Sequence, residues 1–383
     1  MSRVWKDLKV SPPELRIGFT LRSGQSFRWK QTAPEEWTGV VGDRLVTLKQ
    51  TDQTTLFRTY STEPLPVKST TAGGSVTPSP SATTESLLSD YFQLHINLND
   101  CYQRWSELDP NFQTKALRFP GVRVLRQDPF ENLISFICSS NNHISRITQM
   151  VESLCQLYGH RLGTVAGSEF YTFPRLTALA SSSAPSSPSS LPSSTVSPDL
   201  EARLRTLGFG YRAKYISKTV AYLADAYGEE AESWLHSLRD KSYADAHSAL
   251  LKLSGIGPKV ADCICLMSLD KSEVIPVDTH VWQIAVRDYQ FQPSSASPAK
   301  SPAASKPIKS LTTTAYKAVA SYLGDLFGQH AGWAHSVLFI ADLPPVRGVE
   351  SPIVQETLIP DTADLPAITK DVRAAKRPRR KKN

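Results

Sequence analysis

The chain has 383 residues, 40% of them hydrophobic and 21% charged, which is typical of a globular protein with a buried core and room for two domains. No apolar run approaches the ~20 residues of a membrane span, and no secretory signal is recognised, so no membrane partner is expected. Five cysteines without the spacing of a disulfide framework indicate a reducing compartment.

The net charge of +7 resides in the C-terminal tail. Residues 372–383 carry seven Lys and Arg side chains and no acid, so the rest of the chain is formally neutral and the overall charge is no argument for DNA binding. The run KRPRRKK predicts a nuclear import signal, with a polyanion-binding arm as the alternative. At the other end, Arg3 and Lys6 stand beside Asp7, which leaves a mitochondrial form open.

Residues 5–60 alternate short apolar runs with turn residues. Two runs, at 37–41 and 44–49, flank a Gly-Asp pair and predict a β-hairpin. Ahead of them, LRSGQSFRW at 21–29 predicts a turn that leads into an aromatic strand. The Ser, Thr, Pro and Gly residues of 69–84 predict a disordered insert.

Helices are predicted from residue 86 onward. Asp128-Pro129-Phe130-Glu131 is typical of a helix start, because Asp caps, Pro occupies the first position and Glu completes a capping box. That helix ends in the polar run 138–143, which predicts an exposed loop. The later run GFGYR at 208–212 presents an aromatic ring and an arginine between glycines, as a wedge into a base stack would, or as a turn with a half-buried tyrosine.

The order of these elements predicts an α+β protein. A β-rich N-terminal domain is expected over residues 1–116, an all-α body over 117–343 and a disordered tail over 344–383. Three inserts rich in Ser, Pro or both are expected to expand surface loops of these domains, at residues 69–84, 181–198 and 293–310.

The stretch 249–280 carries the most informative motif. A helix ends at Gly255-Ile256-Gly257, where glycines permit the positive φ of a tight turn, and Pro258 begins the next helix. The N–H groups of such a turn form an anion site that usually holds a DNA phosphate, although an ordinary helix-turn-helix corner is equally compatible.

Lys259 lies in the first turn of the new helix. The positive end of the helix dipole, like burial, is expected to lower the pKa of this lysine and to favour the nucleophilic neutral amine. Cys263 and Met267 follow at i+4 and i+8 on one face, and Asp278 is expected to cap the next helix. A row of core residues would explain Lys259, Cys263 and Met267, and an ordinary helix cap would explain Asp278. Neither explains why the two features occur together.

Together these residues resemble the helix-hairpin-helix, Gly/Pro-rich loop and aspartate motif of base-excision DNA glycosylases. More narrowly, VADCICLM at 260–267, PVDTH at 276–280 and SGQSFRW at 23–29 resemble the eukaryotic 8-oxoguanine DNA glycosylases. The likeness covers about residues 5–60 and 86–342. It implies a TATA-binding-protein-like N-terminal domain that packs beside the helical body, with the active site in the cleft between them.

The resemblance implies a bifunctional glycosylase and lyase that flips 8-oxoguanine, or formamidopyrimidine-guanine, opposite cytosine out of duplex DNA. Lys259 would attack the sugar C1′ and form a Schiff base, and Asp278 would stabilise the oxocarbenium charge. Cys263 and Phe339 would sandwich the base, with Met267 beside them. The Gly24 carbonyl would accept the N7–H that 8-oxoguanine has and guanine lacks.

The resemblance also implies a DNA-binding surface, on which Asn141 would fill the gap in the stack and Tyr211 would wedge the duplex. Its other members are Arg146 and Arg212 at the estranged cytosine, Gly255 and Gly257 in the hairpin, His280 at a phosphate, and the supporting Asp342.

The chain departs from the family pattern at His335 and His143. His335 stands where the family has the glutamine that reads the Watson–Crick edge, and His143 replaces the usual asparagine of the NNH run. A neutral histidine can accept a hydrogen bond from that edge, whereas a protonated one cannot. Excision is therefore expected to fall below the usual imidazole pKa of ~6.5.

Two alternatives stay open: a glycosylase with another oxidised-base preference, and a non-catalytic helix-hairpin-helix DNA-binding module. Some related glycosylases carry a four-cysteine iron–sulfur cluster near the C-terminus, and no cysteine follows Cys265. A binding module would need neither Lys259 nor Asp278. We expect no metal or organic cofactor, a nuclear monomer, and two partners: damaged double-stranded DNA and, through the tail, the nuclear import machinery.

Overall fold

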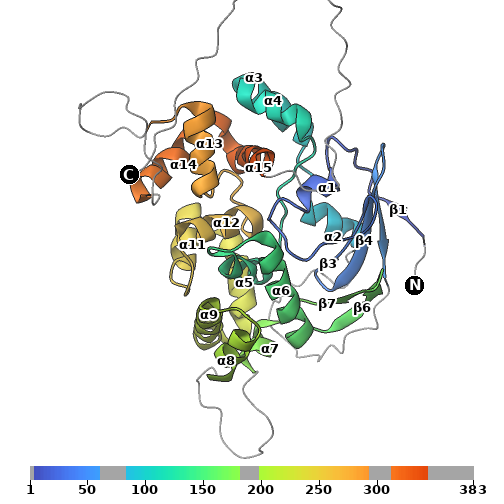
Figure 1. The fold of residues 1–383 in the computed structure, drawn as a ribbon, viewed down its shortest axis with the longest axis vertical. Helices are drawn as coiled ribbons and strands as arrows, with labels where there is room; N and C mark the ends of the chain where they lie inside the picture. The colour runs from blue at the N-terminus through green and yellow to red at the C-terminus, as the bar shows by residue number, and fades with distance from the viewer. Residues whose placement is uncertain (1–3, 61–82, 182–197, 293–311, 344–383) are drawn as a thin grey trace, which may run out of the picture. The chain divides into compact units, whose positions relative to one another are not determined.

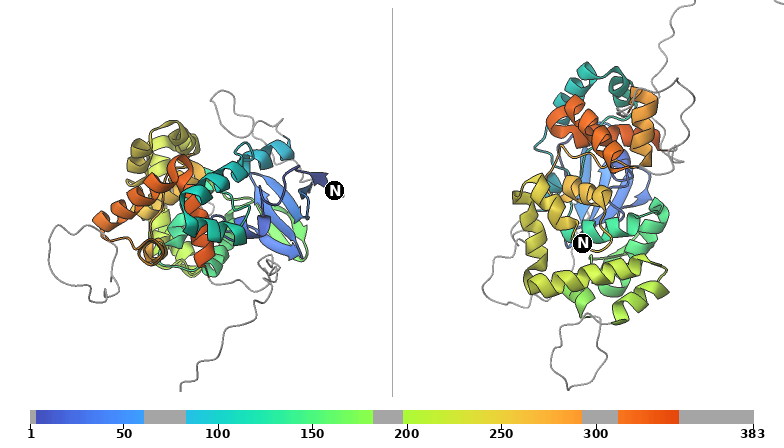
Figure 2. Two further views of the ribbon diagram at one scale, coloured as in Figure 1. Left: turned by 90° about the horizontal axis from the view of Figure 1, so that it is seen from above. Right: turned by 90° about the vertical axis from the view of Figure 1, so that its left-hand side faces the viewer.

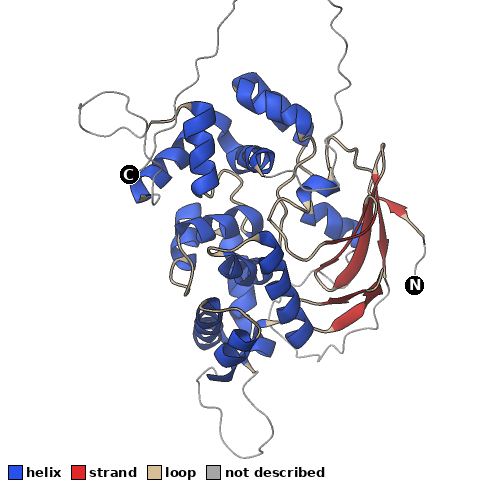
Figure 3. Ribbon diagram, viewed as in Figure 1, coloured by secondary structure: helices blue, strands red, loops and turns tan. Residues whose placement is uncertain are grey.

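The computed structural model describes residues 4–60, 83–181, 198–292 and 312–343. Strands gather on one side of these residues and helices on the other, which confirms the α+β class (Figure 3). The views of Figure 2 likewise show the sheet against one flank of the helices.

The N-terminal part is an antiparallel sheet of five strands in the order β1-β5-β4-β3-β2. The predicted hairpin is confirmed, because Val41 pairs with Arg44 across the Gly-Asp turn. The strand expected within residues 21–29 is wrong: this segment follows a short helix as an irregular loop, and pairing begins at Lys30. The elements are β1 Lys6–Asp7, α1 Ile17–Thr20, β2 Lys30–Ala33, β3 Glu36–Val41, β4 Arg44–Gln50, β5 Thr55–Thr59 and α2 Thr84–Tyr91.

Helices make up most of the remaining described chain (Figure 1). They are α3 Leu98–Leu108, α4 Pro110–Arg118, α5 Pro129–Ser139, α6 Ile144–Tyr158, α7 Leu176–Ala180, α8 Pro198–Thr206, α9 Arg212–Tyr227, α10 Ala231–Ser237, α11 Tyr243–Leu250, α12 Pro258–Ser268, α13 Thr279–Tyr289, α14 Thr313–Phe327 and α15 Ala331–Asp342, with single 3-10 turns at Gly228–Glu230, Leu238–Asp240 and Gly328–His330.

Helices α5 and α12 form the centre of the helical core. The predicted cap and first residue of α5 are confirmed, since the Asp128 side chain accepts the Glu131 N–H at 2.8 Å and Pro129 is the first helical residue. The expected capping box is wrong in its second half, because the Glu131 carboxylate accepts from Arg28 at 2.9 Å instead. Leu133, Ile134 and Ile137 of this helix are fully buried. The two helices therefore give the site a rigid support.

The expected all-α body contains one β-hairpin and is wrong in that detail. Strands β6 (Arg161–Val165) and β7 (Ser168–Tyr171) pair with each other. Val165 and Phe170 pack on Val40 and Leu45 of the N-terminal sheet, and Figure 1 shows the hairpin beside that sheet. The alternation of this hairpin is short, and the sequence pattern did not reveal it.

The boundary expected near residue 116 does not separate two cores. Leu98 and Trp105 of α3 and Phe112 of α4 belong to the helical core, and the Trp105 indole donates to the Phe327 carbonyl at 3.2 Å. The three inserts and the tail fall outside the described residues. The exceptions at the edges of the first two inserts are Thr83, which caps α2, Thr84, which begins it, Ser181, and Pro198, which begins α8.

Candidate active site

One cavity lies where the loop after α1 meets helices of the body, and its volume is about 460 Å³ including the part that is open to solvent. Its lining includes every predicted catalytic and base-binding residue: Gly24, Lys259, Cys263, Met267, Asp278, His335 and Phe339. The other lining residues are Ser23, Gln25 and Pro276, which belong to the SGQSFRW and PVDTH motifs, and Phe136 and Ser336, which the sequence did not single out.

Helix α12 supplies the stripe of Lys259, Cys263 and Met267, as its i, i+4, i+8 spacing predicts. The hairpin before it needs glycine at Gly255, where φ is +84° and a Cβ atom would lie 2.7 Å from the Tyr215 side chain. At Gly257 the expectation of a positive φ is wrong, because this residue is extended at φ −95° and caps the helix. Only Gly255 is fixed by backbone geometry.

Asp278 caps α13, which confirms the expectation. Its Oδ1 atom accepts the N–H groups of His280 at 2.9 Å and Val281 at 3.0 Å. Both bonds use the same oxygen, so Oδ2 has no hydrogen bond within the described chain. The helix N-terminus stabilises the carboxylate, and one oxygen stays available to a substrate.

The pKa of Lys259 lies above its ordinary value, so the expected lowering is wrong. Burial lowers this pKa, but negative charge on Cys263 and Asp278 outweighs burial. Burial raises the pKa of the Cys263 thiol. The lysine is an ammonium in the free protein, and it must lose a proton before it can act as a nucleophile.

His335 is buried in the wall of the cavity, and neither ring nitrogen has a hydrogen-bond partner among the described residues. Burial lowers the pKa of this imidazole to about 4, although the charge of Asp278 opposes that effect. The ring is thus neutral at physiological pH. Its centroid lies 6.1 Å from that of Phe339 on the same helix, so α15 presents two rings to one cavity.

Gly24 lies in a loop that is anchored on both sides. Its φ of +76° is a left-handed conformation that favours glycine. The Gln25 amide donates to the Arg123 carbonyl at 2.8 Å and accepts the Leu125 N–H at 2.9 Å, and Gln127 donates to the Gln25 carbonyl at 3.0 Å. These buried bonds hold the loop of the N-terminal part against the helical body.

The loops at 139–144 and 208–212 are brought together, as a shared DNA surface requires. The Tyr211 hydroxyl donates to the Ser140 carbonyl at 2.9 Å, and Arg146 donates to the Gly208 carbonyl at 3.2 Å. Asn141 is exposed at the tip, with a φ of +47°. Arg212 is buried and donates to the carbonyls of Ser140 and Asn141, so it clamps the two loops.

His280 and Asp342 lie together at the rim of the site. His280 is exposed, and its Nδ1 lies 3.8 Å from a carboxylate oxygen of Asp342. Arg287 of α13 approaches the other oxygen of Asp342 at 2.7 Å. The carboxylate therefore joins the C-terminal end of α15 to α13.

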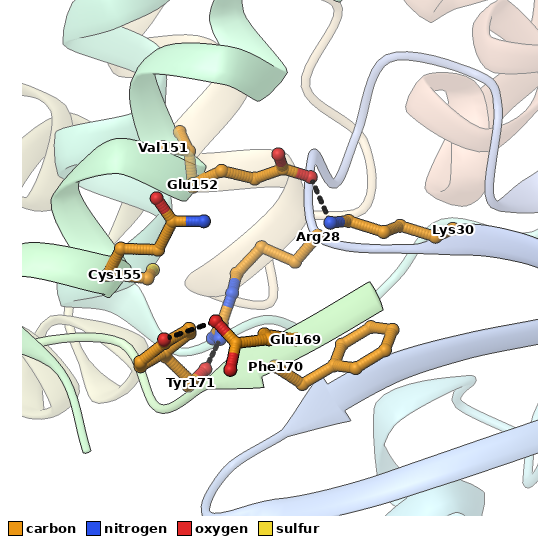
Figure 4. A pocket seen from close by; sticks show the side chains of 9 residues that line it. Arg28, Lys30, Val151, Glu152, Cys155, Glu169, Phe170 and Tyr171 are labelled. Carbon is orange, nitrogen blue, oxygen red and sulfur yellow. Dashed lines mark hydrogen bonds and ion pairs between the residues drawn. The ribbon is translucent and has the colours of Figure 1, made fainter. Parts of the chain in front are cut away.

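A second cavity, of about 340 Å³, lies between the sheet, α6 and β7 (Figure 4). Its buried Arg28 donates to Glu131 at 2.9 Å and to the Tyr171 carbonyl, while Lys30 pairs with Glu152 at 2.9 Å. Arg28 and Lys30 thus already have protein partners. The bond to Tyr171 attaches the β6–β7 hairpin to the rest of the molecule, and the Lys30–Glu152 pair joins β2 to α6.

The part of the chain that the structure describes has no helix long and apolar enough to cross a membrane. The same residues hold no group of three or more His, Cys, Asp or Glu side chains placed to bind a metal ion.

A helix-hairpin-helix that presents a lysine to a capping aspartate beside an open cavity defines the class of base-excision DNA glycosylases. Residues 134–309 match the HhH-GPD superfamily of base excision DNA repair proteins, and residues 7–133 match the N-terminal domain of 8-oxoguanine DNA glycosylase.

Relatives identify the family within that class. The chain is 39% identical over 343 residues to the N-glycosylase/DNA lyase OGG1 of Arabidopsis thaliana, covering 89% of this chain and 80% of that protein. It is 33% identical over 370 residues to the N-glycosylase/DNA lyase of Saccharomyces cerevisiae, covering 91% and 89%. The chain belongs to the N-glycosylase/DNA lyase family of 8-oxoguanine DNA glycosylases.

Solved structures agree on the fold. The apo-form of the Clostridium acetobutylicum 8-oxoguanine glycosylase/lyase aligns with a TM-score of 0.65 at 23% identity, over 87% of this chain and 94% of that one. MBOgg1, solved with a low affinity DNA ligand, aligns with a TM-score of 0.65 at 24% identity, over 86% and 92%.

Proposed function

We propose that this protein excises 8-oxoguanine, and formamidopyrimidine-guanine, opposite cytosine in duplex DNA and then cleaves the abasic strand. One observation carries the proposal: Lys259, Asp278 and Gly24 line a single cavity. Cys263, His335 and Phe339 line the same cavity and can contact the faces and the edge of a flipped base. The Clostridium acetobutylicum enzyme has been solved with double-stranded DNA containing cytosine opposite 8-oxoguanine, which supports the same partner here.

The chemistry begins with Lys259, whose Nζ loses a proton and attacks the sugar C1′ as the bond to the base breaks. The base leaves with the bonding electron pair and takes up a proton, so the proton given up by the ammonium balances it. The free Oδ2 of Asp278 stabilises the positive charge that develops on the sugar. Nitrogen replaces the base at C1′. The C1′–O4′ bond then breaks, O4′ takes up a second proton from the amine, and a Schiff base forms. Loss of the C2′ proton expels the 3′ phosphate by β-elimination. The raised pKa of Lys259 makes the first proton loss part of the barrier.

Base selection would use the cavity walls. Cys263 and Phe339 would enclose the faces of the base, with Met267 at its edge. The anchored Gly24 carbonyl would accept N7–H, and the neutral His335 ring would accept from the guanine edge.

The DNA surface would use the joined loops. Asn141 would enter the gap that the flipped base leaves, and Tyr211, which is 47% exposed, would wedge beside it. The other DNA contacts we propose are Arg146 and Arg212 at the estranged cytosine, Gly255 and Gly257 of the hairpin, and His280, held by Asp342, at a phosphate.

The test uses duplexes that carry 8-oxoguanine opposite each of the four bases, with borohydride added to trap the Schiff base. We expect nicking and a covalent adduct, greatest opposite cytosine. Lys259→Gln should abolish both, whereas Lys317→Gln, which changes an exposed lysine of α14, should change neither. An undiminished adduct with Lys259→Gln would assign the chemistry to another amine. A further duplex that carries an oxidised pyrimidine tests the substrate, and faster release of that base than of 8-oxoguanine would assign another one.

The basic tail supports a nuclear location and a contact with import receptors. Removal of residues 373–383 should disperse a fluorescent fusion from the nucleus while leaving excision on short duplexes intact. A truncated protein that still accumulates in the nucleus would overturn this part of the proposal.

A further inference from the structure

Asp262 is a buried carboxylate on α12 that the proposed chemistry does not use. It lies between Lys259 and Cys263 in the sequence, is 2% exposed, and faces other helices. The Tyr243 hydroxyl of α11 donates to its Oδ1 at 2.8 Å, and the Tyr316 hydroxyl of α14 donates to its Oδ2. A third group, His247 Nε2, lies 3.4 Å from Oδ1.

Tyr316 connects this carboxylate to the segment that carries Asp278. Its oxygen accepts the Val277 N–H at 3.3 Å, while its proton goes to Asp262. Val277 is 1% exposed and directly precedes Asp278. Residues 274–278 have no regular secondary structure, and Pro276 has no N–H to donate. The Tyr316 hydroxyl therefore ties an irregular segment to α12.

We propose that Asp262 is a positioning residue, which through Tyr316 holds the Val277 backbone and so sets the place of Asp278 relative to Lys259. Lys259 and Asp262 lie one turn apart on α12, so this chain of bonds links the two catalytic residues through a second route besides the peptide chain. The inference rests on the proposed function of Lys259 and Asp278.

The protonation states fit this arrangement. Burial, and then the charge of Asp262, raise the pKa of both Tyr243 and Tyr316. Both hydroxyls therefore keep their protons and act as donors. Tyr316 is the one that also accepts from the backbone before Asp278.

This difference supplies a matched pair of variants. Tyr316→Phe and Tyr243→Phe each remove one hydroxyl from the same carboxylate, but only Tyr316→Phe releases Val277. We expect Tyr316→Phe to slow single-turnover excision at least about tenfold, because small misplacements of reacting groups are costly, and to leave the Kd for uncleaved duplex within about twofold. Tyr243→Phe should keep the wild-type rate within about twofold.

The pH profile separates positioning from a general loss of structure. Cys263 and Asp278 both raise the pKa of Lys259, and only Asp278 follows the segment that Tyr316 holds. If Asp278 drifts away in Tyr316→Phe, the rise of the rate with pH should move to lower pH, and it should stay in place in Tyr243→Phe. Asp262→Asn weakens the acceptor of the Tyr316 proton, so the rise of its rate with pH should also move to lower pH. This variant provides the measurement if Tyr316→Phe does not fold.

The proposal would be overturned if the two tyrosine variants had the same excision rate and if the rate rose at the same pH in both, whether both are slow or neither is. A slow Tyr316→Phe protein with weakened DNA binding and an unmoved pH limb would also overturn it. These outcomes are distinct from a failure of the proposed function, which would show as activity surviving in Lys259→Gln.

Discussion

His335 illustrates how one substitution in a family pattern changes the physics of a site. The ring is buried and its nitrogens have no partners among the described residues. It stays neutral because a charged ring would lose its hydration, and the cavity provides no hydrogen bonds in place of that water. Our expectation that excision would fall below a pKa of ~6.5 used the value of an exposed imidazole. The pKa of this residue in the folded protein is about 4, so any loss of excision that its protonation causes is expected near that pH instead.

The same pKa predicts a stability effect. Between its unfolded value of ~6.5 and its folded value of about 4, the unfolded state holds more protons, so unfolding free energy falls as the pH falls through that range. The wild type should lose about 2 kcal/mol relative to His335→Gln between about pH 7 and about pH 5. Urea unfolding of both proteins at each pH measures this, and parallel curves would contradict it.

At the scale of elements, the hairpin before α12 offers a test of what each glycine does. Gly255→Ala would place a Cβ atom in the Tyr215 side chain at a positive φ, whereas Gly257 is extended and nothing lies within 4 Å of the place that an added methyl group would take. We expect Gly255→Ala to lower the unfolding free energy by ~1–3 kcal/mol and Gly257→Ala by less than ~1 kcal/mol.

DNA affinity supplies the second readout for this pair. If both hairpin N–H groups approach a phosphate, duplex binding should weaken in both variants although only Gly255→Ala is unstable. Equal stability of the two variants would show that the left-handed turn is not what requires glycine at Gly255.

The elements also show how far the sequence could predict this molecule. Helix starts at Asp128 and Asp278 were predictable, because a cap is a contact between residues two or three positions apart. The direction of the Lys259 pKa shift was not, since it depends on how burial, which lowers this pKa, balances against Cys263 on the same helix and against Asp278, which the fold brings from nineteen residues away. Phe136 and Tyr316 had no local signal at all, because their roles come entirely from tertiary contacts.

At the scale of the whole molecule, Arg123 joins the N-terminal segment to the helical body. It is 1% exposed, pairs with Glu14 at 2.6 Å, and donates to the carbonyls of Gln93 and Ile96 at 2.8 Å each. Glu14 in turn accepts the N–H groups of Leu98 and Asn99 at the start of α3. The active-site loop around Gly24 belongs to the part that these contacts hold in place.

Arg123→Lys should therefore destabilise both parts together. A lysine cannot reproduce the planar fork, and it leaves buried acceptors unpaired, so we expect a loss of ~3 kcal/mol. Arg205→Lys, in the exposed pair with Glu201, is the matched control and should cost less than ~0.5 kcal/mol. Since the helices of residues 98–118 share the core of the body, circular dichroism and tryptophan fluorescence should report one transition in each protein. Separate transitions, with the sheet melting first in the Arg123 variant alone, would mean that the N-terminal part folds by itself and that Arg123 only docks it.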